Sequence, residues 1–404
     1  MLDFKTGLLR YGVRRDLPFP VAEYERRIAA VRGEMRKRGI DLLIVHQTAS
    51  WCWLTGYDST MPSCYGVGLL PLEGAPATHT AELEVPCVLR NSIVEDIEVY
   101  DTNNDTTTAE QLADVLLERG YDGKTIGIEL GYSDTFAIGA YDTRSYLMLT
   151  SKLPRATFVD TTELVLDLRV VKTPLELAQM RKAGELTMLG IEASLDATHA
   201  GTTDNVIVAA GYQAMIANGS ELPSIDGMIM AGSRAGLGPH MVFKREQINA
   251  GDTVFFEYTG THNRYNAPMQ RAAVIGQPPR QVRKIADASL DTLDALIENI
   301  KPGKTGDDIA QIAMKHLRPA LNEAWFHGVL GYSIGLGMQP TWTESPTYIY
   351  EGAERVLQPG MTFHLPICIF VPGLHGVGFS ESVAVTETGC EVLTPGRHRE
   401  LVIR

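Results

Sequence analysis

Three side chains that could perform acid–base chemistry stand in the second half of the chain. Glu257 follows the mostly apolar run 253–256, where a low local dielectric would strengthen the attraction of its carboxylate for a cation. His240 follows a loop of glycine and proline and could shuttle protons, while the phenol of Tyr332 could donate to a developing charge or to a substrate carboxylate. Together they predict a site in which Glu257 either attacks a cationic carbon or activates water for that attack.

Each of these residues also has a purely structural interpretation. Glu257 could belong to a buried salt bridge, with Arg271 as its partner. His240 could be an ordinary surface or core histidine, and Tyr332 could pack beside Gly335. The residue types alone leave these alternatives open, so the elements that would bring the three side chains together must be considered.

Helix and strand patterns alternate in the first part of the chain. Residues 21–39 place apolar and charged residues at helical spacing and end on Gly39, a residue typical of helix C-caps. A second helical pattern covers residues 108–119. Short apolar runs that fit buried strands lie at 41–45, 67–70, 97–100 and 125–129. We therefore predict an α/β first domain over residues 1–168.

The pattern changes in the rest of the chain, and we predict a second, α+β domain over residues 169–404. A long helix is expected at 175–197, with Pro174 at its start. Further helices are expected at 203–218, 278–299 and 306–324. Strands are expected at 253–258, 271–275, 361–370 and 383–386.

The composition is that of a compact globular protein. Of the 404 residues, 44% are hydrophobic and 21% charged, which leaves little room for long disordered segments. The net charge of −13 and the absence of a basic patch argue against nucleic acid as a partner. We find no signal peptide and no stretch near the ~18 apolar residues of a membrane span, so we expect a cytoplasmic protein without a membrane partner. The five cysteines form no CxxC pair and are expected to be reduced thiols.

Several stretches, taken in order, resemble the pita-bread family of creatinase and aminopeptidase P. In the first domain they are Arg-Gly-Ile-Asp-Leu-Leu-Ile-Val at 38–45 and Trp-Leu-Thr-Gly-Tyr at 53–57. In the second domain they are the segments 169–183, 238–240, 250–254, 331–335, 357–361 and 385–386. The resemblance covers nearly the whole chain and implies an N-terminal creatinase-like α/β domain followed by an α+β pita-bread catalytic domain.

The peptidases of this family hold two metal ions on five side chains, namely two Asp, one His and two Glu. The resemblance places those five positions on Glu257, Pro268, Tyr332, Pro366 and either Ser380 or its neighbour Glu381. Proline cannot ligate a metal, so at most one or two carboxylates of the set remain. The resemblance therefore implies a metal-free member of the family, and we expect no other cofactor.

Within the family, the chain resembles the ectoine hydrolases through Gly-Pro-His240, Glu257, Tyr332 and the run Thr-Phe-His364-Leu-Pro. This implies opening of the cyclic amidine of ectoine, a small zwitterion, to N-acetyl-2,4-diaminobutyrate. Creatinase is the alternative: it also hydrolyses a C–N bond without metal and has a histidine at the position of His240, but its pattern has a second histidine where this chain has Tyr332. A non-catalytic binding module is a third interpretation, since such a protein would also have lost the metal ligands.

The resemblance also implies residues that could contact the substrate. His364, His375 and Glu381 lie on the last strands, which face the cavity in this family, although alternation along a strand requires some of them to point away. Weaker candidates, for which structural roles are favoured, are Tyr265, Gln270 and Glu344, and Arg271 is a further candidate for substrate contact.

Three aromatic residues of the first domain, Trp51, Trp53 and Tyr57, could cap a cationic ring by cation–π contacts worth ~0.5–2 kcal/mol, or could belong to the core. In creatinase-like dimers the first domain of one subunit closes the active site of its partner, and the resemblance implies a homodimer with a shared site here. His316 and His327 are expected on a helix, without a ligand partner at suitable spacing, and are therefore expected to be structural.

Overall fold

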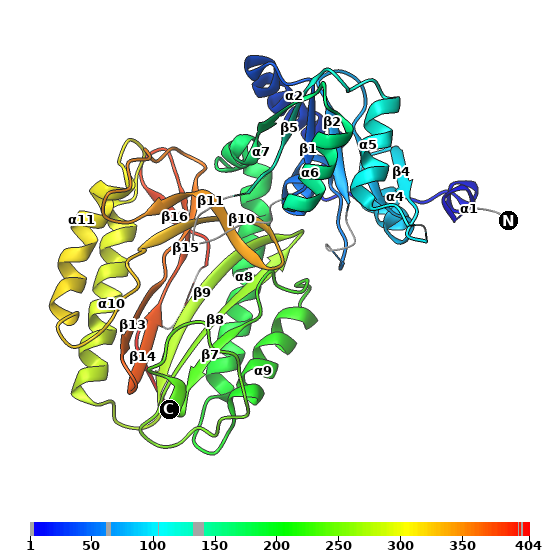
Figure 1. Ribbon diagram of the computed structural model, residues 1–404. Helices are drawn as coiled ribbons and strands as arrows, with labels where there is room; N and C mark the ends of the chain where they lie inside the picture. Colours follow the sequence, from blue (N-terminus) through cyan, green and yellow to red (C-terminus); the bar gives the residue numbers. More distant parts are fainter. Residues whose placement is uncertain (1–3, 62–65, 104, 132–140, 395, 397–398) are drawn as a thin grey trace. The chain divides into compact units, whose positions relative to one another are not determined.

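The computed structural model of the chain describes residues 4–61, 66–103, 105–131, 141–394, 396 and 399–404, with the main chain alone at 345 and 346. The chain divides into two compact units, Met1–Arg169 and Val170–Arg404 (Figure 1). Among the described residues we find no helix with the length and apolar content needed to cross a membrane.

Unit 1 is built on a six-stranded mixed sheet with the strand order β4-β3-β2-β1-β5-β6. The strands are β1 (Leu42–Val45), β2 (Val67–Pro71), β3 (Ala77–Ala81), β4 (Asp96–Tyr100), β5 (Thr125–Ile128) and β6 (Thr157–Asp160). The helices are α1 (Phe4–Tyr11), α2 (Val21–Arg38), α3 (Thr48–Thr55), α4 (Val85–Asn91), α5 (Thr108–Glu118), α6 (Thr143–Lys152) and α7 (Thr162–Arg169), with a 3-10 turn, η2 (Glu82–Glu84). The predicted α/β class of the first domain is confirmed.

Local sequence signals explain where the predicted helices of unit 1 begin and end. Gly39 terminates α2 in the left-handed region, at φ 66°, and its N–H donates back to the last turn of the helix. Thr107 and Glu110 form a reciprocal capping box at the start of α5. The predicted helices at 21–39 and 108–119 therefore match the structure to within one residue at each end.

Unit 2 contains a nine-stranded sheet with the order β16-β15-β12-β10-β9-β8-β7, to which β11 adds beside β10 and β17 beside β9, and a separate hairpin of β13 and β14. The strands are β7 (Met228–Ala231), β8 (Thr253–His262), β9 (Tyr265–Val274), β10 (Gly331–Met338), β11 (Thr341–Ile349), β12 (Thr362–His364), β13 (Ile367–Val371), β14 (His375–Phe379), β15 (Ser382–Val385), β16 (Cys390–Val392) and β17 (Val402–Ile403). The helices are α8 (Pro174–Ala197), α9 (Asp204–Ala217), α10 (Arg280–Asn299) and α11 (Gly306–Leu317), with 3-10 turns η3 (Gly232–Arg234) and η4 (Arg318–Ala320). In Figure 1 the pair α8 and α9, in green, and the pair α10 and α11, in yellow, flank the strands, and the α+β pita-bread class is confirmed.

The hairpin of β8 and β9 decides which way Glu257 points. Glu257 lies directly opposite Gln270 in the antiparallel register, so the two side chains share one face of the sheet. Phe256, on the other face, packs in the apolar cluster of α8 and α9. Phe255, on the same face as Glu257, packs with Phe370 of β13. Glu257 is therefore directed toward the side of the sheet that the β13–β14 hairpin covers.

Two predicted elements differ from the structure. The helix expected at 306–324 ends at Leu317 and continues only as the short turn η4, because Pro319 has no N–H to extend the hydrogen bonding. The strand expected at 361–370 is interrupted at Leu365 and Pro366, since proline cannot donate to a strand ladder. The interruption leaves β12 in the large sheet and β13 in the separate hairpin.

Candidate active site

Glu257 is a buried carboxyl group whose partners are uncharged. Only 3% of the residue is exposed, and its Oε2 accepts a hydrogen bond of 2.8 Å from Nε2 of Gln270. Burial raises the pKa of Glu257 to about 7. Within the described part of the chain, no Lys or Arg forms an ion pair with this carboxylate, and Oε1 of the Gln270 amide is buried without a hydrogen-bond partner. The salt bridge with Arg271 considered from the sequence is therefore not formed.

His364 is held at both of its ring nitrogens. Strands β10 and β12 pair with Tyr332 directly opposite His364, and the phenol lies 2.7 Å from Nδ1. The hydroxyl of Ser380 lies 2.6 Å from Nε2 and also accepts the N–H of Gln270 at 2.7 Å. The indole N–H of Trp342 donates to the Tyr332 oxygen at 2.9 Å. The ring orientation of His364 is thus fixed from three strands.

This network links His364 to the buried carboxyl group. Nδ1 of His364 lies 3.8 Å from Oε1 of Glu257. Burial, with a smaller effect of the nearby His327, lowers the pKa of His364 to about 3, so its imidazole is neutral. Burial and the charge of Glu257 raise the pKa of the Tyr332 phenol, so it keeps its proton. The site therefore combines a carboxyl group that titrates near neutral pH with an uncharged imidazole and a phenol.

A neutral imidazole donates through one nitrogen and accepts through the other, so the network has two hydrogen-bonding arrangements. In one, Tyr332 donates to Nδ1 and Nε2–H donates to Ser380. In the other, Ser380 donates to Nε2 and Nδ1–H donates to Tyr332, which frees the phenol proton for another acceptor. Exchange between the two carries a proton across His364 without charging it, which suits acid–base work in a buried site.

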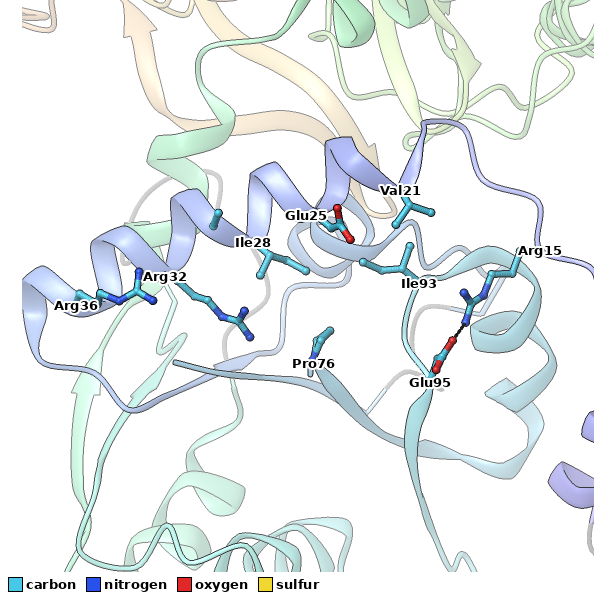
Figure 2. Close-up of a pocket in the computed structure, with 10 residues that line it drawn as sticks. Arg15, Val21, Glu25, Ile28, Arg32, Arg36, Pro76, Ile93 and Glu95 are labelled. Carbon is cyan, nitrogen blue, oxygen red and sulfur yellow. Dashed lines mark hydrogen bonds and ion pairs between the residues drawn. The ribbon is translucent and has the colours of Figure 1, made fainter. Parts of the chain in front are cut away.

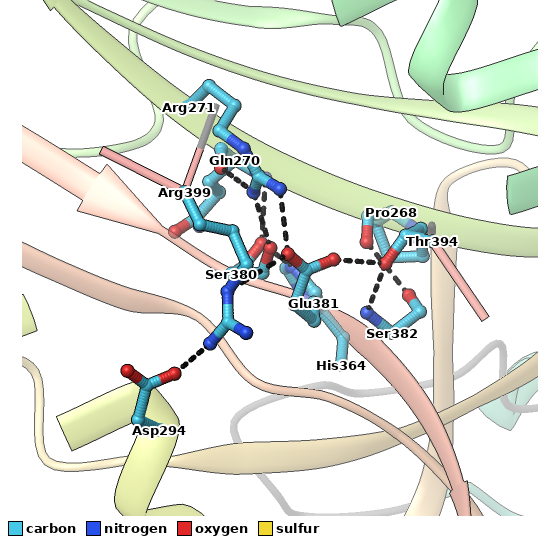
Figure 3. Close-up of polar contacts among 10 residues, drawn as sticks. All are labelled: Pro268, Gln270, Arg271, Asp294, His364, Ser380, Glu381, Ser382, Thr394 and Arg399. Atoms are coloured by element: carbon cyan, nitrogen blue, oxygen red, sulfur yellow. Dashed lines mark hydrogen bonds and ion pairs between the residues drawn. The ribbon is translucent and has the colours of Figure 1, made fainter. Parts of the chain in front are cut away.

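Ser380 and Glu381 are adjacent in sequence but belong to different networks. The carboxylate of Glu381 accepts from Nη2 of Arg271 at 2.7 Å and from the hydroxyl of Thr394 at 2.6 Å, and Arg399 lies 3.8 Å away (Figure 3). Of the two residues considered for the fifth position, Ser380 is the one that reaches His364. The oxygens of Glu381 are used inside the protein, which favours a structural role, and its contact with a substrate stays a prediction.

Three more of the predicted substrate contacts hold the fold together. Arg271 is fully buried and donates to Glu381 and to the main-chain oxygens of Gln270 and Ser380. The hydroxyl of Tyr265 donates to Glu176 at 2.9 Å, which ties β9 to the start of α8. Glu344 forms a buried ion pair of 2.5 Å with Lys172. For these three residues the structure favours the structural role over contact with a substrate.

The aromatic residues expected to cap the substrate are buried in unit 1. The ring of Trp51 covers Gly68 so closely that a Cβ on that glycine would overlap it. Trp53 stacks on the guanidinium of Arg27, whose carbon lies 5.0 Å from the ring centre. Tyr57 donates to Glu84 at 2.5 Å. These side chains form core contacts, which favours their structural alternative, and a cation–π contact with a substrate stays a prediction.

The other candidate histidines lie around the network and not within it. His240 is exposed in the irregular segment between η3 and β8. Burial, with a smaller effect of the nearby His240, lowers the pKa of His327 to about 4. His327 lies outside any helix, contrary to expectation, and its Nδ1 accepts the N–H of Val329 at 3.3 Å. His375 begins β14, where burial lowers its pKa and the charge of Asp252 acts in the opposite direction. No hydrogen bond joins His375 to the Glu257 network in the described residues, and its contact with a substrate stays a prediction.

Sequence reasoning missed three roles. Ser380 contacts His364, Trp342 donates to Tyr332, and His327 contributes to the lowered pKa of His364. Ser380 had been considered only as a lost metal ligand, and Trp342 had no pattern to distinguish it from a core residue. The signal that could have found Ser380 is strand alternation, because Ser380 and Glu381 cannot both face the same side.

A shallow groove of about 450 Å³ lies in unit 1, remote in sequence from these residues (Figure 2). Its apolar floor includes Val21, Ile28 and Ile93. Its arginines are already engaged: Arg15 pairs with Glu95, as Figure 2 shows, and the others bond to a glutamate or to main-chain oxygens. The groove contains none of the chemistry found around Glu257.

The donor set at the five family positions does not fit a pair of hard divalent cations. Among the described residues, no group of three or more His, Cys, Asp or Glu is placed to hold a metal ion. Glu257 offers one carboxylate, two positions are prolines, and Tyr332 and Ser380 are engaged with His364. Magnesium- or manganese-type sites require several carboxylate or carbonyl oxygens around one point.

The sequence profile of metallopeptidase family M24 matches residues 178–387, more than half of the chain. The chain belongs to this family. The M24 chain also matches the creatinase/prolidase N-terminal domain over residues 27–171. The relatives with named activities are hydrolases, among them an ectoine hydrolase and a dipeptidase. This M24 member therefore belongs to a family of hydrolases.

Two curated relatives illustrate the range of the family. The chain is 31% identical to ectoine hydrolase from Halomonas elongata over 404 residues, covering 94% of this chain and 97% of that protein. It is 29% identical to Xaa-Pro dipeptidase from Pyrococcus furiosus over 272 residues, covering 67% of this chain and 76% of that protein. Relatives of this M24 chain thus include, by name, an ectoine hydrolase and a dipeptidase.

Solved structures agree on the fold. The X-Pro aminopeptidase from Thermotoga maritima superposes with a TM-score of 0.80 at 21% identity, covering 94% of this chain and 99% of that one. The Xaa-Pro dipeptidase from Bacillus anthracis gives a TM-score of 0.79 at 23% identity, covering 94% and 100%. At these identities the similarity shows the pita-bread fold alone.

Proposed function

We propose that this M24 member hydrolyses ectoine to N-acetyl-2,4-diaminobutyrate without a resident metal, with Glu257 as the key carboxylate. The observation that carries the proposal is a buried carboxyl group with no cationic partner among the described residues. A buried carboxylate without a counter-charge is costly, and a bound cation would offset that cost. The amidinium of ectoine is such a cation, and its N–H groups match the Glu257 carboxylate and the unpartnered Gln270 oxygen.

Two routes agree with the arrangement. In the first, Glu257 attacks the amidinium carbon and one ring C–N bond breaks as its nitrogen takes a proton, which leaves an imidoyl ester on Glu257. Water then adds to the same carbon, the bond to Glu257 breaks, and the amide is released with the carboxylate restored. In the second, Glu257 takes a proton from water, and the hydroxide attacks the same carbon. Both consume one water and give an amide and an amine. We favour the first route, with His240 moving protons between the site and solvent.

A creatine-type substrate and a dipeptide are the competing assignments. The similarity to ectoine hydrolase extends over nearly the whole of both chains, which supports the amidine. The donor set at the five family positions does not support a two-metal peptidase, although peptidases are among the relatives. We therefore place hydrolysis of ectoine first and creatine second.

The deciding experiment is NMR of the chelator-treated protein incubated separately with ectoine, creatine and an Xaa-Pro dipeptide. Loss of ectoine with a new acetyl signal, abolished by Glu257→Gln, is the expected result. A covalent adduct on Glu257 in the mass spectrum of a quenched reaction would establish direct attack, and its absence in single turnover would favour activation of water. Turnover of creatine alone, activity restored only by added metal, or inertness toward all three compounds would each overturn the proposal, the last in favour of a binding module.

We also infer that the active form is a homodimer with a shared active site. The support is the resemblance of the sequence to creatinase-like proteins, in which the first domain of one subunit closes the site of the other. Light scattering should give a mass twice that of one chain. A monomer with full activity would contradict the inference.

A further inference from the structure

We propose that Asp204 and Arg234 form a clamp that positions the loop carrying His240. This inference rests on the function proposed above, in which His240 moves protons. Neither residue is a candidate for contact with the substrate. Both are positioning residues, because they would act through the loop.

The His240 loop, residues 235–248, is long and has no regular structure of its own. It connects η3 to β8, and His240 stands near its middle. Ordering such a segment costs conformational entropy for every residue fixed, so a defined position for His240 requires anchors at both ends of the loop.

Asp204 is the anchor at the far end. It begins α9 and is fully buried. Its Oδ2 accepts the N–H of Lys244 at 2.8 Å, and its Oδ1 accepts the N–H groups of Arg245 at 2.7 Å and Glu246 at 3.0 Å. Arg245 takes a left-handed conformation, with φ 72°, that an arginine rarely adopts and that these bonds help to hold.

Arg234 connects the near end of the loop to the same carboxylate. Its Nη2 forms an ion pair with Oδ2 of Asp204, and its Nη1 donates to the main-chain oxygen of Val242. The guanidinium of Arg234, the residue before the loop, thus connects Val242 in the middle of the loop to Asp204 at the start of α9. The seven residues 235–241 are closed into a ring by this contact, and His240 is one of them.

A second contact fixes the same loop from the other side. The N–H of Gly373, in the turn of the β13–β14 hairpin, donates to the oxygen of Gly236 at 2.8 Å. The loop is therefore held between α9 and the hairpin that covers the face of Glu257. Among the described residues, loss of the Asp204 clamp would leave the segment 235–241 with this contact and two local turn bonds, from the N–H of Ala235 to Gly232 and from the N–H of Leu237 to Arg234.

A double-mutant cycle tests whether Asp204 acts through His240. In the full-length protein, Asp204→Asn keeps the shape but replaces one acceptor oxygen by a donor. We expect it to lower kcat for ectoine by about 10- to 100-fold with little change in KM, because a misplaced proton-transfer group slows the chemical step more than binding. In a His240→Ala background, Asp204→Asn should have no further effect.

Tryptic cleavage after Lys244 and Arg245 provides a readout that does not depend on activity. Asp204→Asn should increase cleavage at these two sites at least tenfold, while the matched control Asp308→Asn, which removes a cap of α11 by the same exchange, should not. Arg234→Lys keeps the positive charge, but a single ammonium group cannot contact both Asp204 and Val242 as the two guanidinium nitrogens do. It should therefore have the same effects as Asp204→Asn, but smaller ones. It serves in place of Asp204→Asn if that variant does not fold.

Two results would overturn the clamp. One is a folded Asp204→Asn or Arg234→Lys variant that is cleaved no faster at Lys244 and Arg245 than Asp308→Asn. The other is an effect of Asp204→Asn on kcat that adds fully to that of His240→Ala. A wild-type protein inert toward ectoine would refute the proposed function, and the cleavage experiment would then decide the clamp alone, so the two failures are distinguishable.

Discussion

Two buried glutamates of unit 2 differ in what surrounds their carboxylates. Glu381 accepts from Arg271 and Thr394, so its charge is compensated within the fold. Among the described residues, Glu257 accepts only from the neutral amide of Gln270. The carboxylate of Glu381, between β14 and β15, is compensated within the fold, whereas that of Glu257, on β8, has no cationic partner in the part of the chain that the structure describes.

The pH dependence of activity should follow the ionisation of Glu257. Attack on the substrate and activation of water both need the carboxylate, and the pKa of Glu257 is raised by burial to about 7. We therefore expect kcat/KM for ectoine to rise with pH and to level off above about pH 7, since this parameter reports groups of the free protein. A profile that is flat from pH 5 to 8 would contradict the assignment.

The stabilities of two Glu→Gln variants should change in opposite directions. The native pKa of Glu257, about 7, lies above its usual 4.5, so the free energy of unfolding falls as pH rises between these values and stays low above them. At pH 8, Glu257→Gln should therefore stabilise the protein by about 1–3 kcal/mol, with the gain disappearing near pH 4.5. Glu381→Gln leaves Arg271 buried without its anion and should destabilise by about 3–5 kcal/mol. Denaturant titrations at the two pH values measure both effects.

Tyr332→Phe should disturb the hydrogen bonds around His364 without creating a cavity. The change removes one oxygen and leaves both the indole N–H of Trp342 and Nδ1 of His364 without their partner. We expect a loss of about 1–3 kcal/mol in the free energy of unfolding and a lower kcat, because the phenol proton is no longer available. An unchanged kcat would limit Tyr332 to packing.

At the scale of elements, the approach of β14 to the β8–β9 hairpin should be sensitive to a single methyl group. A Cβ on Gly378 would overlap the ring of Phe255 and come within 3.0 Å of Oε1 of Gln270. Gly378→Ala should therefore destabilise by about 1–3 kcal/mol and reduce activity by moving Gln270 relative to Glu257. Gly389→Ala, where an added Cβ meets nothing within 4 Å, is the control and should leave both unchanged.

Sequence patterns predicted elements best where the signal is local. The start of α8 at Pro174 and the end of α2 at Gly39 depend on caps that can be read within a few residues. The interruption of the last apolar run at Pro366 was missed, because the residues on both sides of it are equally apolar. The division of the chain, expected after residue 168, lies after Arg169 in the structure.

The candidate site was harder to predict than the elements, because pairing over long sequence separations decides it. Glu257 and Tyr332 were both singled out, and the structure brings them to His364 through β8, β10 and β12. Nothing in the residue types distinguished Glu381, which binds Arg271, from Glu257. That difference depends on strand register and on the position of Thr394, neither of which a local pattern contains.

For the whole molecule, removal of metal should change neither activity nor stability. Of the five donor positions of the family, two are prolines, Tyr332 and Ser380 contact His364, and Glu257 offers one carboxylate. Dialysis against a chelator should leave kcat for ectoine unchanged, and added Mn²⁺ should not raise the melting temperature, because a ligand stabilises only a protein that binds it. A saturable increase in melting temperature with Mn²⁺ would contradict this expectation.

The bond between the indole of Trp342 and the phenol of Tyr332 gives the site a natural optical reporter. Indole emission responds to the polarity and hydrogen bonding of the ring, and Trp342 is buried one residue away from His364 in the network. The chain has only four tryptophans, of which Trp51 and Trp53 lie in the other unit. A ligand that rearranges the Tyr332 proton should therefore change the emission of the protein, so that binding can be followed in real time without a label.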